Sequence, residues 1–290
     1  MPDESIQVAR NRAYELLRRL DAALEAGEID EEGWYREVAV VITPAYLAQD
    51  NPRAQSGHSG DDAHWEQARG LIADAIDRSG TFLDVGSASG YLMECIQRWA
   101  LARGFVVEPY GLDIAPELAA LARRRLPHWA DRIYVGNVIN WEPPRRFDFV
   151  RSGLEYVPAR RHRDLVARLL RDYVAPGGRL IIGTFNEERD ETRREPPQEA
   201  LVASWGFTIA GRTERPHYHD PRLVYRAFWI DAPAHEPPAH RWLPTPAAHP
   251  LQEPASGRPQ PTTSSRGWPG RHSCAGKTQR VASFGKLCQA

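Results

Sequence analysis

The chain has 290 residues, with 37 Lys+Arg against 38 Asp+Glu, and 42% of its residues are hydrophobic. This length and composition suffice for a packed core in one large or two modest domains. No run approaches the ~20 consecutive apolar residues of a membrane-spanning helix. The N-terminus opens with acidic residues, whereas a secretory signal has a basic region followed by an apolar core. We therefore expect neither a membrane span nor a secretory signal.

The C-terminal residues 232–290 differ in composition from the rest of the chain. They hold seven of the Lys+Arg residues and two acids, which leaves 30 basic against 36 acidic residues for 1–231, and they hold ten of the 24 prolines. Such a segment has too little aliphatic periodicity to offset the entropy of ordering it. We therefore expect a disordered, Pro-rich basic tail, and its scattered charges favour a solvated extension over a nucleic-acid contact.

Cysteine spacing indicates the compartment. Cys95, Cys274 and Cys288 include no close pair, so neither a disulfide framework nor a zinc site is predicted. A reducing cytoplasm is therefore the expected location.

Helical patterns come first along the chain. Apolar residues at spacings of three and four predict a helix over 4–26. A second helix is predicted after Asp30 and is expected to be interrupted at Pro44. The polar segment 49–60 predicts a loop, and a third helix is expected to continue through Ile76.

From residue 81 onward, short apolar runs alternate with helical patterns. This alternation implies crossover connections and a mostly parallel sheet that is covered on both faces. The last two strands have no helix between them, which predicts an antiparallel hairpin at one edge. The predicted strands are 81–85, 106–112, 132–135, 147–151, 179–184, 207–213 and 223–230, and the predicted helices are 90–103, 116–125, 159–173 and 196–204.

The sequence FLDVGSASGY joins the first predicted strand to a helix. The small residues Gly86, Ser87, Ala88 and Gly90 allow a tight turn that approaches a ligand closely, and the following helix offers unpaired N–H groups. Asp113 ends the second predicted strand, where a carboxylate can accept hydrogen bonds from both ribose hydroxyls. Together these features predict a nucleotide-like ligand with its ribose over the switch point of the sheet.

The glycine pattern indicates which nucleotide. A dinucleotide fingerprint has Gly or Ala at its third place, but Tyr91 stands there after Gly86 and Ala88. The segment instead resembles the first motif of class I S-adenosylmethionine-dependent methyltransferases, an acid followed by glycines at alternate places. Asp84, Gly86, Ala88 and Gly90 match that motif, with alanine in place of the middle glycine. The departure leaves slightly less room for the homocysteine part.

The resemblance extends over residues 60–231 and implies S-adenosyl-L-methionine as the cofactor. Asp113 matches the ribose-binding acid, the residues after the third strand match the adenine-binding loop, and the end of the fourth strand matches the active-site rim. The cofactor-binding residues that it implies are Asp84, Gly86, Ser87, Ala88, Gly90, Asp113, Ile114, Asn137, Val138 and Ser152.

The resemblance also implies the architecture. We expect a Rossmann-like, doubly wound α/β fold with a mostly parallel seven-stranded sheet and a C-terminal antiparallel hairpin. Residues 1–78 are expected to form an N-terminal helical cap or lid, residues 79–231 the cofactor-binding domain, and residues 232–290 the tail.

Methyl transfer from a sulfonium requires mainly alignment and exclusion of water, and it requires a base only when the acceptor is protonated. His58, in the loop before the third helix, has a side chain suited to accepting a proton. Glu155 and Tyr156 lie where the fourth strand meets the predicted pocket. These three are the candidate catalytic residues, although a surface histidine and a solvated glutamate are plain alternatives.

The rim sequence SGLE lacks the Asn/Asp-Pro-Pro-aromatic run that the resemblance associates with methylation of nucleobase or glutamine amino groups. A small-molecule acceptor is therefore predicted, and the acidic body argues against nucleic acid. His217, His219 and Asp220 are spaced like metal ligands, but a polar hairpin loop is the preferred interpretation and no metal is predicted. Two alternatives stay open, namely an NAD-dependent oxidoreductase and a non-catalytic S-adenosylmethionine-binding module.

Overall fold

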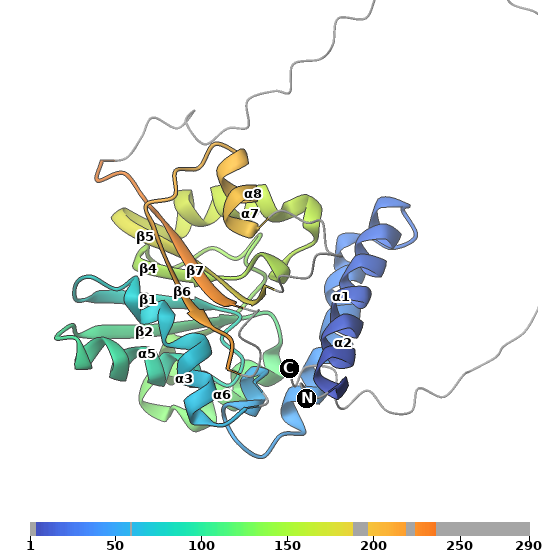
Figure 1. The fold of residues 1–290 in the computed structure, drawn as a ribbon, viewed down its shortest axis with the longest axis horizontal. Coiled ribbons are helices and arrows are strands. Elements are labelled where there is room, and N and C mark those ends of the chain that lie inside the picture. The colour runs from blue at the N-terminus through green and yellow to red at the C-terminus, as the bar shows by residue number, and fades with distance from the viewer. Residues whose placement is uncertain (1–3, 59, 188–196, 219–223, 236–290) are drawn as a thin grey trace, which may run out of the picture.

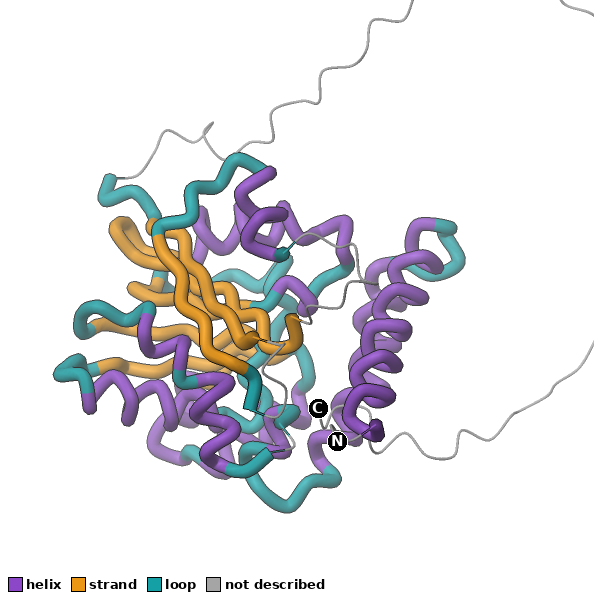
Figure 2. Tube along the Cα trace, in the orientation of Figure 1, coloured by secondary structure: helices purple, strands orange, loops and turns teal. Residues whose placement is uncertain are grey.

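The computed structural model describes residues 4–58, 60–187, 197–218 and 224–235. A seven-stranded sheet in the order β3-β2-β1-β4-β5-β7-β6 lies at its centre, with helices on both faces (Figures 1 and 2). The strands are β1 (Gly80–Val85), β2 (Val107–Asp113), β3 (Ile133–Val135), β4 (Phe147–Ser152), β5 (Val174–Glu187), β6 (Gly211–Pro216) and β7 (Val224–Asp231).

The first five strands are parallel, and β7 pairs antiparallel with both β5 and β6. This arrangement confirms the predicted doubly wound sheet and its edge hairpin. Strand β1 lies in the middle, with β2 on one side and β4 on the other. The strand order changes side at β1, because β2 and β3 follow on one side of it and β4 and β5 on the other. The carboxyl ends of β1, β2 and β4 therefore form the crevice where α/β folds bind ligands.

Two helical layers cover the sheet. On one face Trp65, Ile72 and Ile96 pack against Phe82 and Phe149. The opposite face is covered by a second cluster that includes Leu165, Val166 and Val202. The helices that precede and follow the strands are α3 (Asp62–Arg69), α4 (Leu71–Asp74), α5 (Tyr91–Ala102), α6 (Pro116–Arg125), α7 (His162–Arg168) and α8 (Gln198–Ser204).

An antiparallel helical pair, α1 (Glu4–Glu25) and α2 (Glu31–Leu47), stands apart from both layers (Figure 1). Leu20, Leu24 and Trp34 form the contact between the two helices. At the start of α2, the carboxylate of Glu31 accepts hydrogen bonds from Arg160 and Arg161, each at 2.8 Å. These ion pairs join the helical pair to the segment that follows β4.

Some predicted boundaries were wrong. Helix α2 continues through Pro44 to Leu47, because Ala45 is buried and Tyr46 packs against a cluster on the sheet domain, which compensates for the missing backbone hydrogen bond. The third helix is divided at Gly70, where an added Cβ would meet the Nη1 of Arg215 from β6 at 2.9 Å.

In the second half of the chain, other helix and strand boundaries also differ from the predicted ones. The predicted helix over 159–173 begins as an α-helix only at His162 and ends in a π-helical turn, Leu169–Tyr173. The predicted strand over 207–213 begins only at Gly211. Phe207 and Ile209 pack against the core ahead of it, and the Ala210 N–H donates to the Trp229 carbonyl of β7 at 2.8 Å. Ala232, the first residue of the predicted tail, is buried and donates to the Gly178 carbonyl at 2.8 Å. The rest of that tail, from 236 on, lies outside the described residues.

Candidate functional site

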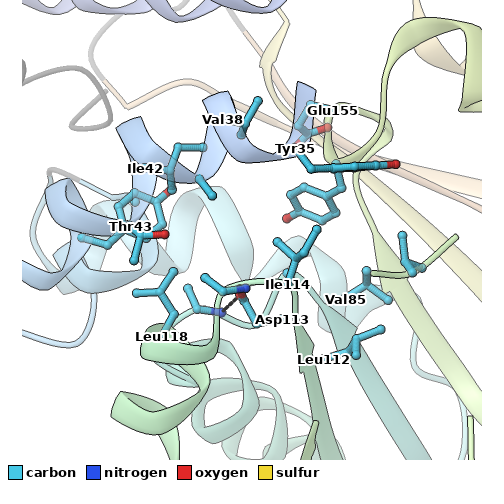
Figure 3. Close-up of a pocket in the computed structure, with 18 of the residues that line it drawn as sticks. Tyr35, Val38, Ile42, Thr43, Val85, Leu112, Asp113, Ile114, Leu118 and Glu155 are labelled. Atoms are coloured by element: carbon cyan, nitrogen blue, oxygen red, sulfur yellow. Dashed lines mark hydrogen bonds between the residues drawn. The ribbon is translucent and has the colours of Figure 1, made fainter. Parts of the chain in front are cut away.

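A cavity of about 360 Å³ lies between the helical pair and the carboxyl ends of the central strands (Figure 3). Val38, Ile42 and Thr43 of α2 line it on one side, and Asp113 and Leu118 line it on the other. Ligand pockets of roughly 300–1,000 Å³ bind most small ligands and cofactors. This cavity is therefore large enough for a nucleotide-like ligand, and it lies at the switch point of the sheet, where the sequence predicts such a ligand.

The turn after β1 has the backbone shape that its small residues predict. Gly86, Ala88 and Gly90 have φ angles of 74°, 46° and 75°. Ala88 is the one non-glycine residue with a positive φ in the part of the chain that the structure describes. A Cβ on Gly86 would meet the ring of Tyr156 at 2.7 Å, so glycine is required there by both conformation and space.

Asp113 connects this turn to the end of β2. Its carboxylate is 6% exposed and accepts hydrogen bonds from the Ala88 N–H at 2.8 Å and the Ala115 N–H at 2.9 Å. Burial raises the pKa of Asp113, and the two N–H donors oppose that rise. An ionised carboxylate has about four lone-pair sites, so the two protein donors leave capacity for hydroxyls in the cavity that Asp113 lines.

Ile114, Asn137 and Val138 line the cavity beside Asp113, as the sequence predicts. Asn137 Oδ1 accepts a hydrogen bond from the Ile139 N–H at 3.1 Å, which orients its amide. Tyr35 of α2 also lines the cavity. Burial raises its pKa, an effect that its interaction with the Asn137 side chain partly offsets. An apolar side chain, an amide and an aromatic ring therefore meet at this end.

Asp84 lies outside the cavity lining and pairs with Arg151. The two side chains are 1% and 4% exposed, and Arg151 Nη1 donates to Asp84 Oδ1 at 3.2 Å and to the Tyr156 hydroxyl at 2.7 Å. Burial raises the pKa of Asp84 to about 6, although Arg151 opposes the rise. Burial alone would lower the pKa of Arg151, but Tyr156 and Asp84 outweigh it and the pKa is raised.

The remaining predicted cofactor residues do not line the cavity. Ser87 and Ser152 are buried and, like Gly90, lie outside the cavity lining. Ser152 Oγ donates to the Gly153 carbonyl at 3.2 Å. A Cβ on Gly111 would meet Ser87 Oγ at 2.8 Å, so this glycine lets β2 approach the turn closely.

Of the three candidate catalytic residues, two line the cavity and one does not. Glu155 and Tyr156 line the cavity, and burial raises the pKa of Tyr156 to about 12. His58 lies outside the lining, with its ring centroid 5.5 Å from that of Trp65 in an edge-on arrangement. Burial, followed by the charges of Arg69 and Arg53, lowers the pKa of His58 to about 3.

Several polar residues that line the cavity had no predicted role in the site, among them Tyr35, Arg69, Thr184 and Gln198. The sequence placed Arg151 at the active-site rim but did not predict its partner. One signal for that partner was available, because Arg151 follows the apolar residues Phe149 and Val150 of a buried strand, and a buried charge requires a partner. Its register partner on β1 is Asp84. Of the sequence's possible metal ligands, His219 and Asp220 lie outside the described residues. None of the described helices is both long and apolar enough to cross a membrane.

No protein-family model matches the chain. It is 35% identical over 101 residues to a trans-aconitate 2-methyltransferase from Methylobacterium nodulans, a match that covers 32% of this chain and 38% of the relative. The chain thus spans about two fifths of that relative.

Solved structures give a broader match. Phosphoethanolamine N-methyltransferase 1 from Haemonchus contortus, solved with phosphoethanolamine and S-adenosylhomocysteine, superposes with a TM-score of 0.54 at 11% identity, over 74% of this chain and 53% of that chain. A 1,6-didemethyltoxoflavin-N1-methyltransferase from Burkholderia thailandensis gives a TM-score of 0.45 at 23% identity, over 68% and 90% of the two chains. The strand order, the antiparallel edge hairpin and the superposition on the Haemonchus contortus enzyme all point to one architecture. The chain therefore has the fold of class I S-adenosylmethionine-dependent methyltransferases.

Proposed function

We propose that the protein is an S-adenosylmethionine-dependent methyltransferase that acts on a small molecule. The observation that carries this proposal is the position of Asp113, a buried carboxylate that lines the cavity and is held beside the turn 86–90. A carboxylate at the end of β2, next to a turn with left-handed backbone angles, can accept hydrogen bonds from the hydroxyls of a ribose. The local match to a trans-aconitate methyltransferase supports the same activity.

The described residues fit the parts of this cofactor. Asp113 would hold the ribose hydroxyls, Ile114, Asn137 and Val138 would surround the adenine, and the turn through Gly86 would receive the methionine part. Bound S-adenosylmethionine would supply an electrophilic methyl group. The buried residues Asp84, Ser87 and Gly90 would act indirectly, by fixing the shape of the turn. Ser152 would act in the same indirect way on the end of β4, where its hydroxyl donates to the Gly153 carbonyl.

The chain's own contribution would be alignment and exclusion of water. We propose that α1 and α2, within the predicted cap 1–78, cover the cavity and select the acceptor, and that residues 79–231 bind the cofactor. Glu155 and Tyr156 line the cavity and are the better placed candidates for a proton acceptor. His58 would have to act from outside the lining.

A small acceptor is supported by the cavity, which the helical pair and the strand ends enclose. The acidic body of the chain opposes a nucleic-acid substrate. The wide spacing of the three cysteines, of which Cys95 is buried as a free thiol, favours a cytoplasmic location.

Calorimetry separates this proposal from its rivals. S-adenosylhomocysteine should bind to the full chain and NADH should not, since Tyr91 occupies the third place of the dinucleotide fingerprint. Binding of NADH without S-adenosylhomocysteine would favour an oxidoreductase. Formation of S-adenosylhomocysteine from S-adenosylmethionine, with trans-aconitate or a metabolite extract as acceptor, would then distinguish an enzyme from a non-catalytic binding module.

A further inference from the structure

A charged contact joins the helical pair to the segment that follows β4. Arg160 Nη2 and Arg161 Nε both donate to Glu31 Oε1 at 2.8 Å, and Arg161 Nη2 donates to Glu31 Oε2 at 3.2 Å. Partial burial would raise the pKa of Glu31, but the hydrogen bonds from Arg161 and Arg160 outweigh it, and the pKa is lowered. Glu31 is therefore ionised at neutral pH. We call its contact with Arg160 and Arg161 the clasp.

Asp21 of α1 makes a second contact beside the clasp. Its Oδ1 accepts hydrogen bonds from Trp34 Nε1 of α2 at 3.0 Å and from the Ala159 N–H at 3.3 Å. One carboxylate thus connects both helices of the pair to the residue that directly precedes the clasp arginines. The helical pair and the segment 159–161 are therefore held together from α1 as well as from α2.

The face of α2 that carries Glu31 also covers the cavity. Residues spaced by three and four along a helix share one face, and Glu31 begins such a series. The next members of the series all line the cavity and are drawn in Figure 3, namely Tyr35, Val38 and Ile42. Because these residues share one helix with Glu31, the clasp fixes the rotation of α2 about its axis, and with it this wall of the cavity.

The segment on the other side of the clasp also lines the cavity. Two consecutive 3₁₀-helical turns follow β4, Leu154–Tyr156 and Ala159–Arg161. The first contributes Glu155 and Tyr156 to the lining, and the second carries both clasp arginines. The clasp therefore joins two walls of the cavity that come from distant parts of the chain.

The two ends of α2 are anchored differently. At the C-terminal end Tyr46 packs against a cluster on the sheet domain, and the chain continues into that domain. Pro44 lacks the N–H of a regular helical turn, so the helix bends most readily near this end. The clasp lies at the opposite end, next to the turn 26–30 between the two helices. Without the clasp, the pair could swing about the end that contains Pro44.

We propose that the clasp holds the helical pair closed over the cavity, and that its opening admits and releases the ligand. This inference rests on the proposed function for the identity of the ligand, and it adds a control of entry to the same site. The side chains of Arg160 and Arg161 are 44% and 38% exposed. Water and ions therefore reach the contact, which can break while the sheet domain stays folded.

Hydrogen exchange of the ligand-free full chain tests the clasp by itself. Glu31→Gln removes the charge of the carboxylate and keeps its size. Amides of residues 35–47 should exchange about 3- to 10-fold faster than in wild type, because α2 loses a small network of charges that keeps it packed. Amides of β1 should be unchanged. Glu32→Gln is the matched control, since Glu32 is exposed and lies in the same first turn of α2.

A second set of variants checks that the effect belongs to the contact. Arg160→Gln combined with Arg161→Gln should accelerate the same amides as Glu31→Gln does. Adding Glu31→Gln to that pair should accelerate them no further, because the contact is already lost. Additive effects in the triple variant would show that the three side chains act independently, which would overturn the clasp.

Binding kinetics separate a closure from a contact that only supports the bound shape. S-adenosylhomocysteine is the probe, followed by stopped-flow tryptophan fluorescence, since Trp34 lines the cavity. A closure that is present with and without ligand slows entry and release alike. Glu31→Gln should therefore raise the association and dissociation rate constants by about 3- to 10-fold each and change the Kd by less than about twofold. A rise in the dissociation rate constant alone would overturn the proposal.

Salt provides the same test in the unmodified protein. Raising the salt concentration from about 0.05 M to about 1 M screens partly exposed charges, so both rate constants should rise in wild type and in Glu32→Gln. They should rise less in Glu31→Gln, where the contact is already lost. An equal response to salt in wild type and Glu31→Gln would contradict the clasp.

Exchange rates in Glu31→Gln that match those of wild type and Glu32→Gln would overturn the clasp whatever the protein binds. Failure of the wild-type protein to bind S-adenosylhomocysteine would instead overturn the proposed function. Hydrogen exchange needs no ligand and would still decide the clasp, so the two failures are distinguishable.

Discussion

The guanidinium of Arg151 lies 3.2 Å from the carboxylate of Asp84, and the two side chains are 4% and 1% exposed. They come from neighbouring parallel strands, where Asp84 and Arg151 are register partners. Arg151 also donates to the hydroxyl of Tyr156, whose ring packs on Gly86. A buried ion pair therefore connects the two central strands to the turn that we propose to hold the cofactor.

Removing one member of this pair should be costly. Arg151→Met leaves the Asp84 carboxylate buried without its cation, and loss of one partner of a buried pair costs about 3–5 kcal/mol. We expect urea unfolding to show a loss of this size in Arg151→Met. The double variant Arg151→Met with Asp84→Leu should recover much of it, because neither charge then remains buried.

The exposed Arg124→Met controls for loss of an arginine as such. A cost in Arg151→Met below about 1 kcal/mol, the usual range for an exposed pair, would show that the pair contributes little to stability.

Replacing Ala88 by glycine should stabilise the protein, in contrast to the loss expected for Arg151→Met. A left-handed conformation costs an alanine about 1–2 kcal/mol, and Ala88 has a φ of 46°. Glycine gains about 0.5–1 kcal/mol of freedom in the unfolded chain, so Ala88→Gly should raise the free energy of unfolding by a net ~0.5–1 kcal/mol, measured by urea titration. Ala120→Gly, within α6, should lower it by about 1 kcal/mol. Equal losses in both variants would show that Ala88 is unstrained.

The turn and Asp113 could be predicted because their signals are local. Alternate small residues after a strand determine the turn's conformation. Asp113 could be located because it directly follows the next apolar run of the sequence, at the end of the second predicted strand. The pairing of Asp84 with Arg151 could not be predicted in this way, because the residues are 67 positions apart and meet only through the order β1-β4. Arg69 enters the cavity through packing of α3 on the sheet, which no spacing in the sequence indicates.

Boundaries were wrong where tertiary packing outweighs local propensity. Pro44 is a helix breaker by itself, but burial of Ala45 and the contacts of Tyr46 hold α2 together past it. Phe207 and Ile209 have the alternation of a strand, yet they pack on the core ahead of β6, which begins at Gly211.

Asp113 should be required for binding the adenosine part. Asp113→Ala removes the proposed acceptor of the ribose hydroxyls, and unpaired buried polar groups cost about 1–3 kcal/mol. S-adenosylhomocysteine and 5′-methylthioadenosine, which carries the same adenosine without the amino-acid part, should therefore bind more weakly by a similar factor in calorimetry. Asp113→Asn keeps an oxygen for one of the two backbone donors and should be the more stable variant. Full affinity in Asp113→Ala would place the ribose elsewhere, and the exposed Asp131→Asn serves as the control.

His58 should make the protein sensitive to acid. Its pKa is lowered by burial from 6.5 to about 3 in the folded protein, so the unfolded chain takes up a proton first as the pH falls. The resulting stability is fully present above 6.5 and is lost progressively as the pH falls towards 3, by about 3 kcal/mol at pH 4 from linkage. His58→Phe should keep the edge-on contact with Trp65 and show less loss of stability over this range in urea titrations.

The exposed His128→Phe should retain the wild-type pH profile of stability. The same His58→Phe variant tests the residue as a proton acceptor, since turnover at pH 7.5 should persist if Glu155 or Tyr156 serves instead. Loss of turnover with unchanged stability and unchanged S-adenosylhomocysteine affinity would assign the proton to His58, in spite of its place outside the cavity lining. An identical pH profile of stability in wild type and His58→Phe would show that the imidazole is not buried in its neutral form.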